Sequence, residues 1–260
     1  MSENIEQKKA DVILVLAIMT MLFTVCIVLY SGVFDRDPKI DVNTNLQFEG
    51  GDDYLSKKLH NIIPYLETAD LKYKTAYQKA TTTIKEIDND LLLTLAYKNS
   101  GSKTTYNTTE LLRNINKFYG DTIFLINRSF NINNIDICEF NKDSNEYNCE
   151  KQNRNGILYQ TRRNIKKVNI NSDIYTLTED VLFYTTEKKE NLIYYKVYTN
   201  ESYEKQIASF TSSDISRSNK PINDYLNKYS EYSNEYQSTF AKNGDEYTWK
   251  ETKKIEKQTN

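Results

Sequence analysis

The chain has 260 residues, with 34 Lys and Arg against 36 Asp and Glu and a formal net charge of −2 at pH 7. This balance argues against a strongly basic nucleic-acid-binding protein and against a polyanionic tail. The single histidine excludes a multi-histidine metal site or a histidine relay within one chain. We therefore expect no metal, no cofactor and no nucleic-acid partner.

Residues 12–34 are the most apolar part of the chain. They read VILVLAIMTMLFTVCIVLYSGVF, which is 23 residues without a charge, 19 of them hydrophobic. A helix of this length would be about 35 Å long, enough to cross a hydrocarbon core of about 30 Å. A cleaved signal peptide is the alternative, but its apolar region would be shorter, about 7–15 residues, with a small-x-small cleavage site. We expect an uncleaved membrane helix, which makes the lipid bilayer a partner.

The charges beside this span do not decide its orientation, because Lys8 and Lys9 precede it and Arg36 and Lys39 follow it. The flanks differ greatly in length, since only 11 residues precede the span. A short tail before a span and a long domain after it are typical of a signal anchor that exports its C-terminal part. We expect a single-pass protein of the cell membrane, with a cytoplasmic tail at 1–11, the transmembrane helix at 12–34, a stalk at 35–52 and an extracytoplasmic domain at 53–260.

Two of the three cysteines support export. Cys138 and Cys149 lie in ICEFNKDSNEYNCE, symmetrically about residues 143–144. A hairpin that turns there places them opposite each other, with Cα atoms about 4.5–5.5 Å apart, which suits a disulfide. Disulfides persist in oxidising compartments, so the bridge and the export depend on each other. The alternative is two unpaired thiols in a cytosolic hairpin.

Capping signatures mark the starts of predicted helices after the span. Thr83 with Glu86 and Asn107 with Glu110 have the spacing of a capping box. Apolar residues recur at helical spacing after each of them. Gly120 follows the second helix, where a C-cap belongs. The predicted helices are 54–66, one that begins at 84 and stops at 99–101, one that ends before Gly120, and one that begins at Pro221.

After Gly120 the spacing changes to that of strands rich in Ile, Val, Tyr, Phe and Thr. The predicted strands are 122–127, 135–141, 146–151, 158–170, 180–185, 192–199 and 203–211. Helices followed by an antiparallel meander are typical of an α+β fold. We expect one domain of about three to four helices packed on a curved antiparallel sheet.

The chain ends in the clearest hairpin, EYQSTFAKNGDEYTWKE. Its Asn-Gly pair at 243–244 favours a two-residue type I′ turn. Counting back from that turn pairs Phe240 with Tyr247 and residue 238 with Trp249. Tyr236, Phe240, Tyr247 and Trp249 would then share one face, which is either part of the core or an aromatic binding face.

This order of elements and the last hairpin, Y-x3-F-x2-N-G-x2-Y-x-W from Tyr236 to Trp249, resemble cystatin-like and nuclear-transport-factor-like cone domains. The Asn, Lys, Ile and Tyr bias of the chain resembles that of membrane-anchored extracytoplasmic proteins of AT-rich Gram-positive bacteria. The resemblance covers about residues 53–255 and implies helices packed into a strongly curved antiparallel sheet. It implies no catalytic residue.

The sequence shows no catalytic constellation. His60 lies in KKLHNII, and the chain has neither a Gly-x-Ser-x-Gly elbow nor a free exported cysteine nucleophile, so we interpret His60 as structural. The acidic pair at 179–180 lies beside a predicted turn, where acidic residues are common. We interpret the basic run at 162–167 as a solvated or edge-protecting strand.

These observations favour a non-enzymatic, membrane-anchored extracytoplasmic module that binds a protein or a cell-envelope polymer, or organises an envelope assembly. One alternative is a cell-wall-active hydrolase with paired carboxylates, because such pairs are assembled only in space. Another is a scaffold of a conjugation-type secretion system, which similarly combines a short inner tail, one span and a cone domain. Two acidic side chains converging in a buried cleft would favour the hydrolase, whereas an apolar or tyrosine-lined cleft would favour binding.

Overall fold

The computed structural model describes residues 46–256, except 52, 70–74, 78–79, 102, 121–122, 133–135 and 152–155. The predicted tail, the predicted transmembrane helix and the first part of the predicted stalk lie outside the described residues. Within the described part, no helix has both the length and the apolar character needed to span a bilayer.

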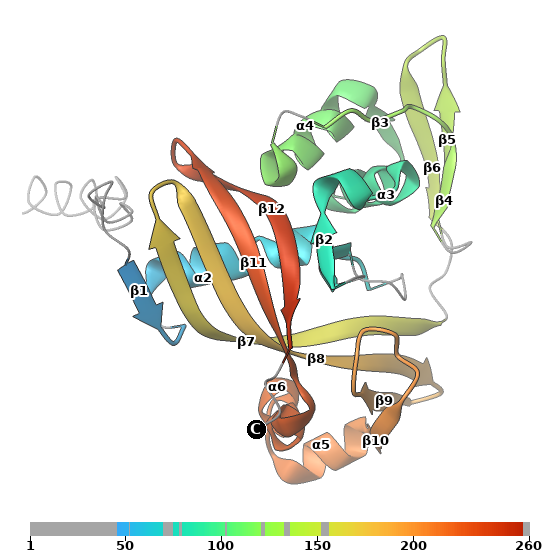
Figure 1. Cartoon of the computed structure of the whole chain (residues 1–260). Coiled ribbons are helices and arrows are strands. Elements are labelled where there is room, and N and C mark those ends of the chain that lie inside the picture. Colours follow the sequence, from blue (N-terminus) through green and yellow to red (C-terminus); the bar gives the residue numbers. More distant parts are fainter. Residues whose placement is uncertain are drawn as a thin grey trace, which may run out of the picture. The chain divides into compact units, whose positions relative to one another are not determined.

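The described chain has an α+β fold dominated by antiparallel strands (Figure 1). The larger sheet has eight strands in the order β1-β7-β8-β11-β12-β2, and β9 pairs with both β8 and β10. Its strands are β1 (Leu46–Glu49), β2 (Thr81–Thr83), β7 (Ile157–Asn171), β8 (Ile174–Lys189), β9 (Leu192–Tyr198), β10 (Gln206–Thr211), β11 (Asn234–Asn243) and β12 (Glu246–Ile255).

Strand β8 joins the two parts of this sheet. Its first half pairs with β11 as far as Val181, and its second half pairs with β9 from Phe183 onward. Its other edge pairs with β7 from end to end. Because both edges of β8 are hydrogen-bonded, the strand runs through the interior and most of its side chains are buried.

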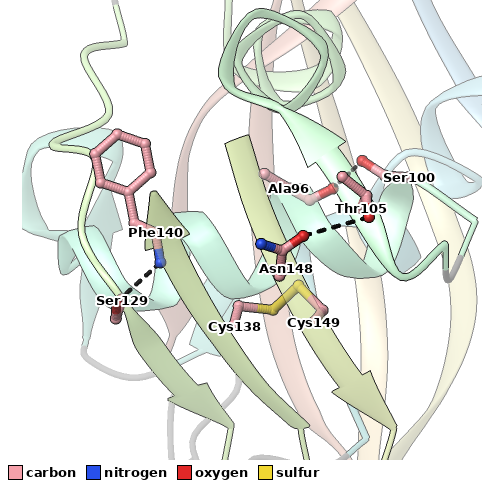
Figure 2. Close-up of a disulfide and its surroundings, with 8 residues drawn as sticks. All are labelled: Ala96, Ser100, Thr105, Ser129, Cys138, Phe140, Asn148 and Cys149. Carbon is pink, nitrogen blue, oxygen red and sulfur yellow. Dashed lines mark hydrogen bonds between the residues drawn. A yellow bond between two sulfur atoms is a disulfide. The ribbon is translucent and has the colours of Figure 1, made fainter. Parts of the chain in front are cut away.

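A second, four-stranded sheet has the order β3-β6-β5-β4. Its strands are β3 (Thr105–Asn107), β4 (Phe130–Ile132), β5 (Asp136–Asn141) and β6 (Glu146–Lys151). Cys138 lies opposite Cys149 in the β5–β6 hairpin, and the two residues form a disulfide with their Cα atoms 4.1 Å apart (Figure 2). The predicted hairpin and its disulfide are confirmed, whereas the single predicted sheet is divided into two.

The helices are short and lie against one or other sheet. They are α2 (Tyr54–His60), α3 (Asn89–Asn99), α4 (Thr108–Tyr119), α5 (Ser212–Ser218) and α6 (Ile222–Leu226), with 3-10 turns η1 (Ile63–Leu66), η2 (Thr75–Tyr77), η3 (Ile84–Glu86) and η4 (Asn227–Tyr232). Helices α3 and α4 pack on each other and on the four-stranded sheet. Helices α5 and α6 and turn η4 cover an apolar cluster that includes Leu182, Val197 and Phe210.

The helix caps match the sequence in part. Asn107 caps α4 by accepting a hydrogen bond from the Thr109 amide, and Gly120 ends the helix with φ of +83°, as the sequence predicts. The capping box at 83–86 closes only the turn η3, and α3 begins later, with Asp88 as its N-cap. The sequence predicts one helix that begins at 84, whereas the structure has the short turn η3 followed by the separate helix α3.

The larger sheet begins earlier in the chain than predicted. Residues 46–49, assigned to the stalk from their polar composition, form strand β1, in which Leu46 pairs with Ile170 of β7. The predicted strand at 122–127 is absent from the described residues 123–127, which are extended but belong to neither sheet. Both errors arise because strand pairing depends on partners far away in the sequence.

The terminal hairpin is present, but its predicted register is wrong. Phe240 pairs with Trp249, and Asn243 pairs with Glu246, so the loop residues are 244–245 rather than 243–244. Gly244 adopts a positive φ of +61° in this loop. The shift is two residues, which keeps each side chain on the same face, so Tyr236, Phe240 and Trp249 are all buried; a β-bulge follows Thr239.

Candidate functional site

The candidate site is formed where α4 faces the tip of the β11–β12 hairpin. One cavity of about 590 Å³ lies between α4 and the hairpin, and a second of about 300 Å³ lies between the hairpin, α4 and α2. Lys117 and Glu246 line both cavities, which therefore adjoin. We call them together the α4–hairpin groove. Their volumes fall in the range of about 300–1,000 Å³ that ligand pockets commonly have.

Aromatic side chains border the smaller cavity of the groove. Phe118 and Tyr247 line it, although both side chains are largely buried. Tyr65 stacks on Phe118 with ring centroids 4.4 Å apart and is 45% exposed. Tyr54 is 44% exposed, and the Nζ atom of Lys58 lies within 6 Å of the ring centroids of both Tyr54 and Tyr247. This end of the groove therefore offers partly exposed aromatic surface beside an ammonium group.

The larger cavity is lined mainly by polar side chains. Its lining comprises Thr109, Leu112, Arg113, Asn114, Asn116, Lys117, Gly120, Asn243, Glu246 and Thr248. The amides and hydroxyls among them can both donate and accept hydrogen bonds. Arg113 and Lys117 are exposed on one face of α4, one turn apart. Neither forms an ion pair with a carboxylate of the described residues.

Helix α2 links the groove to a buried ion cluster behind it. On one side of α2, the Lys58 ammonium donates to the backbone oxygen of Asp245 at 2.8 Å and so fixes the hairpin tip. At the end of α2, Nδ1 of His60 lies 2.5 Å from Oε1 of Glu179, which is only 1% exposed on β8. The Arg163 guanidinium of β7 donates to the backbone oxygen of His60 at 3.0 Å and lies 3.4 Å from the Glu179 carboxylate. The cluster therefore holds α2 in place.

The ion cluster corrects two interpretations of the sequence. The basic run at 162–167 is not simply solvated, because Arg162 and Arg163 are both buried. Burial is the largest single influence and would lower the pKa of Arg163, but Glu179, Tyr77 and Glu67 together outweigh it, and the pKa stands above its ordinary value. Glu179 lies within a central strand rather than beside a turn. His60 has the structural role expected of it, in a half-buried position.

The carboxylates near the described cavities have basic neighbours or lie on the surface. Glu179 is occupied by His60 and Arg163. Glu67 lines a separate cavity of about 230 Å³, and Arg163, rather than a second acid, is the charged residue across it. In the α4–hairpin groove, Asp245 and Glu246 are adjacent residues on an exposed turn.

The four aromatic residues named from the hairpin have different places. Tyr247 lines the groove with one edge. Trp249 lies behind it and packs edge-to-face on Tyr119 of α4, with centroids 5.6 Å apart. Tyr236 and Phe240 belong to the core, where Tyr236 donates a hydrogen bond to the Glu201 carboxylate. The four residues thus form a buried face, of which one member reaches the candidate site.

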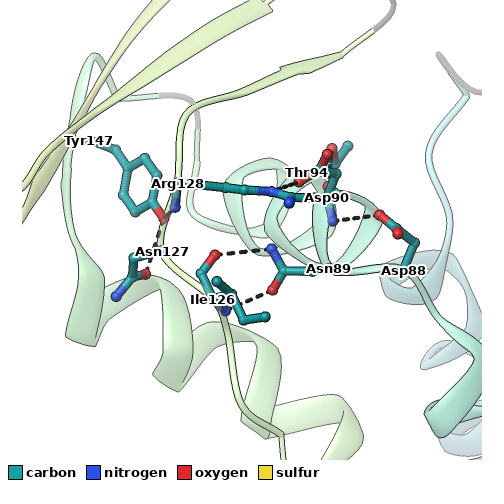
Figure 3. Close-up of polar contacts among 8 residues, drawn as sticks. All are labelled: Asp88, Asn89, Asp90, Thr94, Ile126, Asn127, Arg128 and Tyr147. Atoms are coloured by element: carbon teal, nitrogen blue, oxygen red, sulfur yellow. Dashed lines mark hydrogen bonds and ion pairs between the residues drawn. The ribbon is translucent and has the colours of Figure 1, made fainter.

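Polar contacts also order the segment between α4 and β4 (Figure 3). The Asn89 side chain donates to the backbone oxygen of Ile126 at 3.0 Å and accepts from its amide at 2.7 Å. Arg128 pairs with Asp90 at 2.8 Å. The Asn89 side chain satisfies both backbone groups of Ile126, as a neighbouring strand would, so the segment stays extended outside both sheets. Phe124 of this segment is 92% exposed.

Sequence reasoning missed most residues that line the groove. Arg113 and Lys117 were visible only as the polar side of an amphipathic helix, a pattern shared by most surface helices. Lys58 and Asp245 are 187 residues apart in the chain, and Glu246 directly follows Asp245. No local signal connects them.

No protein-family model matches this chain, and no curated protein or solved structure is similar enough to count as a match. The function is therefore argued from the geometry of the site.

Proposed function

We propose that the protein is a membrane-anchored extracytoplasmic binding module that contacts a component of the cell envelope through the α4–hairpin groove. The observation that carries the proposal is the groove itself, which brings α2, α4 and the β11–β12 hairpin together around two adjoining cavities. Its partly exposed aromatic residues and amide- or hydroxyl-bearing side chains are typical of recognition surfaces.

Two further observations support the setting. The disulfide between Cys138 and Cys149 suits an oxidising compartment. The uncharged run at 12–34 is long enough for a membrane helix. Together they favour a domain that faces the envelope while it is held at the membrane.

The test is co-sedimentation of the full chain, in detergent micelles, with envelope fragments from which the membranes have been extracted. We expect the wild-type chain to sediment with the fragments. The variant Arg113→Glu with Lys117→Glu places like charges beside Glu246 in the groove, so we expect it to remain in the supernatant.

The matched control reverses two exposed basic residues elsewhere, Arg217→Glu with Lys220→Glu on and just after α5. We expect this variant to sediment like the wild type. Equal sedimentation of both variants would show that the groove is not the contact surface. Release of soluble fragments from the envelope by the wild type, but not by a heat-treated sample, would favour the hydrolase instead.

A further inference from the structure

Three features of the α4–hairpin groove point to the chemical class of its ligand, given the binding function proposed above. The first is aromatic surface. Phe118 and Tyr247 line the smaller cavity, and the exposed Tyr65 ring stacks on Phe118. Aromatic faces and edges of this kind provide contact area at a low cost in conformational entropy, and the C–H-rich face of a pyranose ring packs well on them.

The second feature is the density of short side chains that both donate and accept hydrogen bonds. Asn114, Asn116 and Asn243 line the larger cavity together with Thr109 and Thr248. The Oδ1 atom of Asn116 is buried and has no hydrogen-bond partner among the described residues. Neighbouring hydroxyl groups, which are donors and acceptors at once, match such a wall better than an apolar ligand does.

The third feature is positive charge that forms no ion pair with a carboxylate of the described residues, although Asp245 and Glu246 also line the groove. Arg113 and Lys117 are one turn apart on α4, and like charges at this spacing repel each other and destabilise a helix slightly. Neither forms an ion pair with a carboxylate in the described part of the chain. The Nζ atom of Lys250 also lies near the groove, 3.8 Å from the position that a Cβ on Gly120 would occupy. An anionic ligand would relieve this repulsion.

We propose that the α4–hairpin groove binds an acidic oligosaccharide, a chain of sugar units that carry carboxylate groups. Sugar rings pack against the exposed Tyr65 ring, and ring hydroxyls bond to the asparagine and threonine side chains. A carboxylate accepts from the Arg113 guanidinium, whose planar fork matches its two oxygens, and from the Lys117 ammonium. The charge complementarity favours this ligand over a neutral glycan, and the amide- and hydroxyl-rich lining favours it over an acidic peptide.

The test is calorimetric titration of the full chain in detergent micelles with three probes: tetragalacturonate, its fully methyl-esterified form, and hexaglutamate. We expect tetragalacturonate to bind at least about tenfold more tightly than either of the other two, because only it combines sugar rings with carboxylates. Binding of the ester or of hexaglutamate with equal or higher affinity would overturn the proposal.

Variants separate this inference from the proposed function. Arg113→Gln with Lys117→Gln removes the two charges, and we expect it to weaken tetragalacturonate binding about tenfold or more. Arg217→Gln with Lys220→Gln should leave the affinity unchanged, and equal weakening by both would overturn the proposal. If the groove variant fails to sediment with envelope fragments while tetragalacturonate does not bind the wild type, the ligand class is wrong and the binding function stands.

Discussion

At the scale of single residues, the buried cluster of His60, Arg163 and Glu179 is the most consequential polar feature. The Glu179 side chain is 2% exposed and that of Arg163 is 8% exposed. Removing a charge from water is costly, and this cost is offset only while both partners and their hydrogen bonds are present. The cluster therefore makes the position of α2, and with it one end of the groove, depend on residues of β7 and β8.

We predict that Arg163→Met lowers the free energy of unfolding by about 3–5 kcal/mol, because it leaves the Glu179 carboxylate buried without its cation. Urea unfolding followed by the fluorescence of Trp249, the single tryptophan, measures the change. Adding Glu179→Gln should recover most of the loss. Lys189→Met is the control, because Lys189 is 58% exposed and its pair with Glu187 is worth at most about 1 kcal/mol. Equal effects of the two methionine variants would contradict the prediction.

At the scale of elements, the four-stranded sheet is small, and a disulfide links two of its strands. The disulfide joins β5 to β6 across a sequence separation of 11, and Cys138 and Cys149 are both buried. Helices α3 and α4 pack with the strands of this sheet, and α4 also contacts β12. Loosening the hairpin would therefore disturb the helix that forms one wall of the groove.

We predict that Cys138→Ala with Cys149→Ala lowers the free energy of unfolding by about 3 kcal/mol, the loop-closure value for a loop of this length. Reduction of the wild-type chain should lower it by a similar amount, and the double variant should not respond to reductant. Urea unfolding with and without reductant provides the measurement. Cys26→Ala is the matched control and should behave like the wild type. A wild-type chain whose unfolding midpoint is the same with and without reductant would show that the bridge contributes nothing.

At the scale of the whole molecule, the proposed membrane anchor implies that the described domain faces one particular side of the membrane. The proposed topology puts residue 2 in the cytoplasm and the domain outside. The native cysteines are poor reporters, because Cys138 and Cys149 are bonded to each other and buried. Phe124 is a better position for a reporter, since its side chain is 92% exposed.

We predict that a membrane-impermeant maleimide labels Phe124→Cys in intact cells and labels Ser2→Cys only after permeabilisation. The physical reason is that the proposed span at 12–34 would separate the two positions, and the reagent cannot cross the bilayer. The unmodified chain is the control for background labelling. The opposite pattern would reverse the orientation, and labelling of both variants only after permeabilisation would place the whole chain in the cytosol.

Local patterns in the sequence predicted several elements well. Helix α4 begins after Asn107 and ends before Gly120, as its caps predict, and strand β6 has the predicted bounds 146–151. The disulfide followed from symmetry within one hairpin. These features depend on contacts between residues close in the chain, so the sequence carries the information locally.

The sequence by itself determined the α+β class, the cysteine pair and the main helix and strand types. The tertiary structure decided the two-sheet arrangement, the burial of Arg163 beside Glu179 and the assembly of the groove. The physical reason is that burial depends on what covers a strand. Nothing within the basic run shows that β7 lies between β1 and β8, and nothing near Lys58 shows that the β11–β12 hairpin folds back beside it.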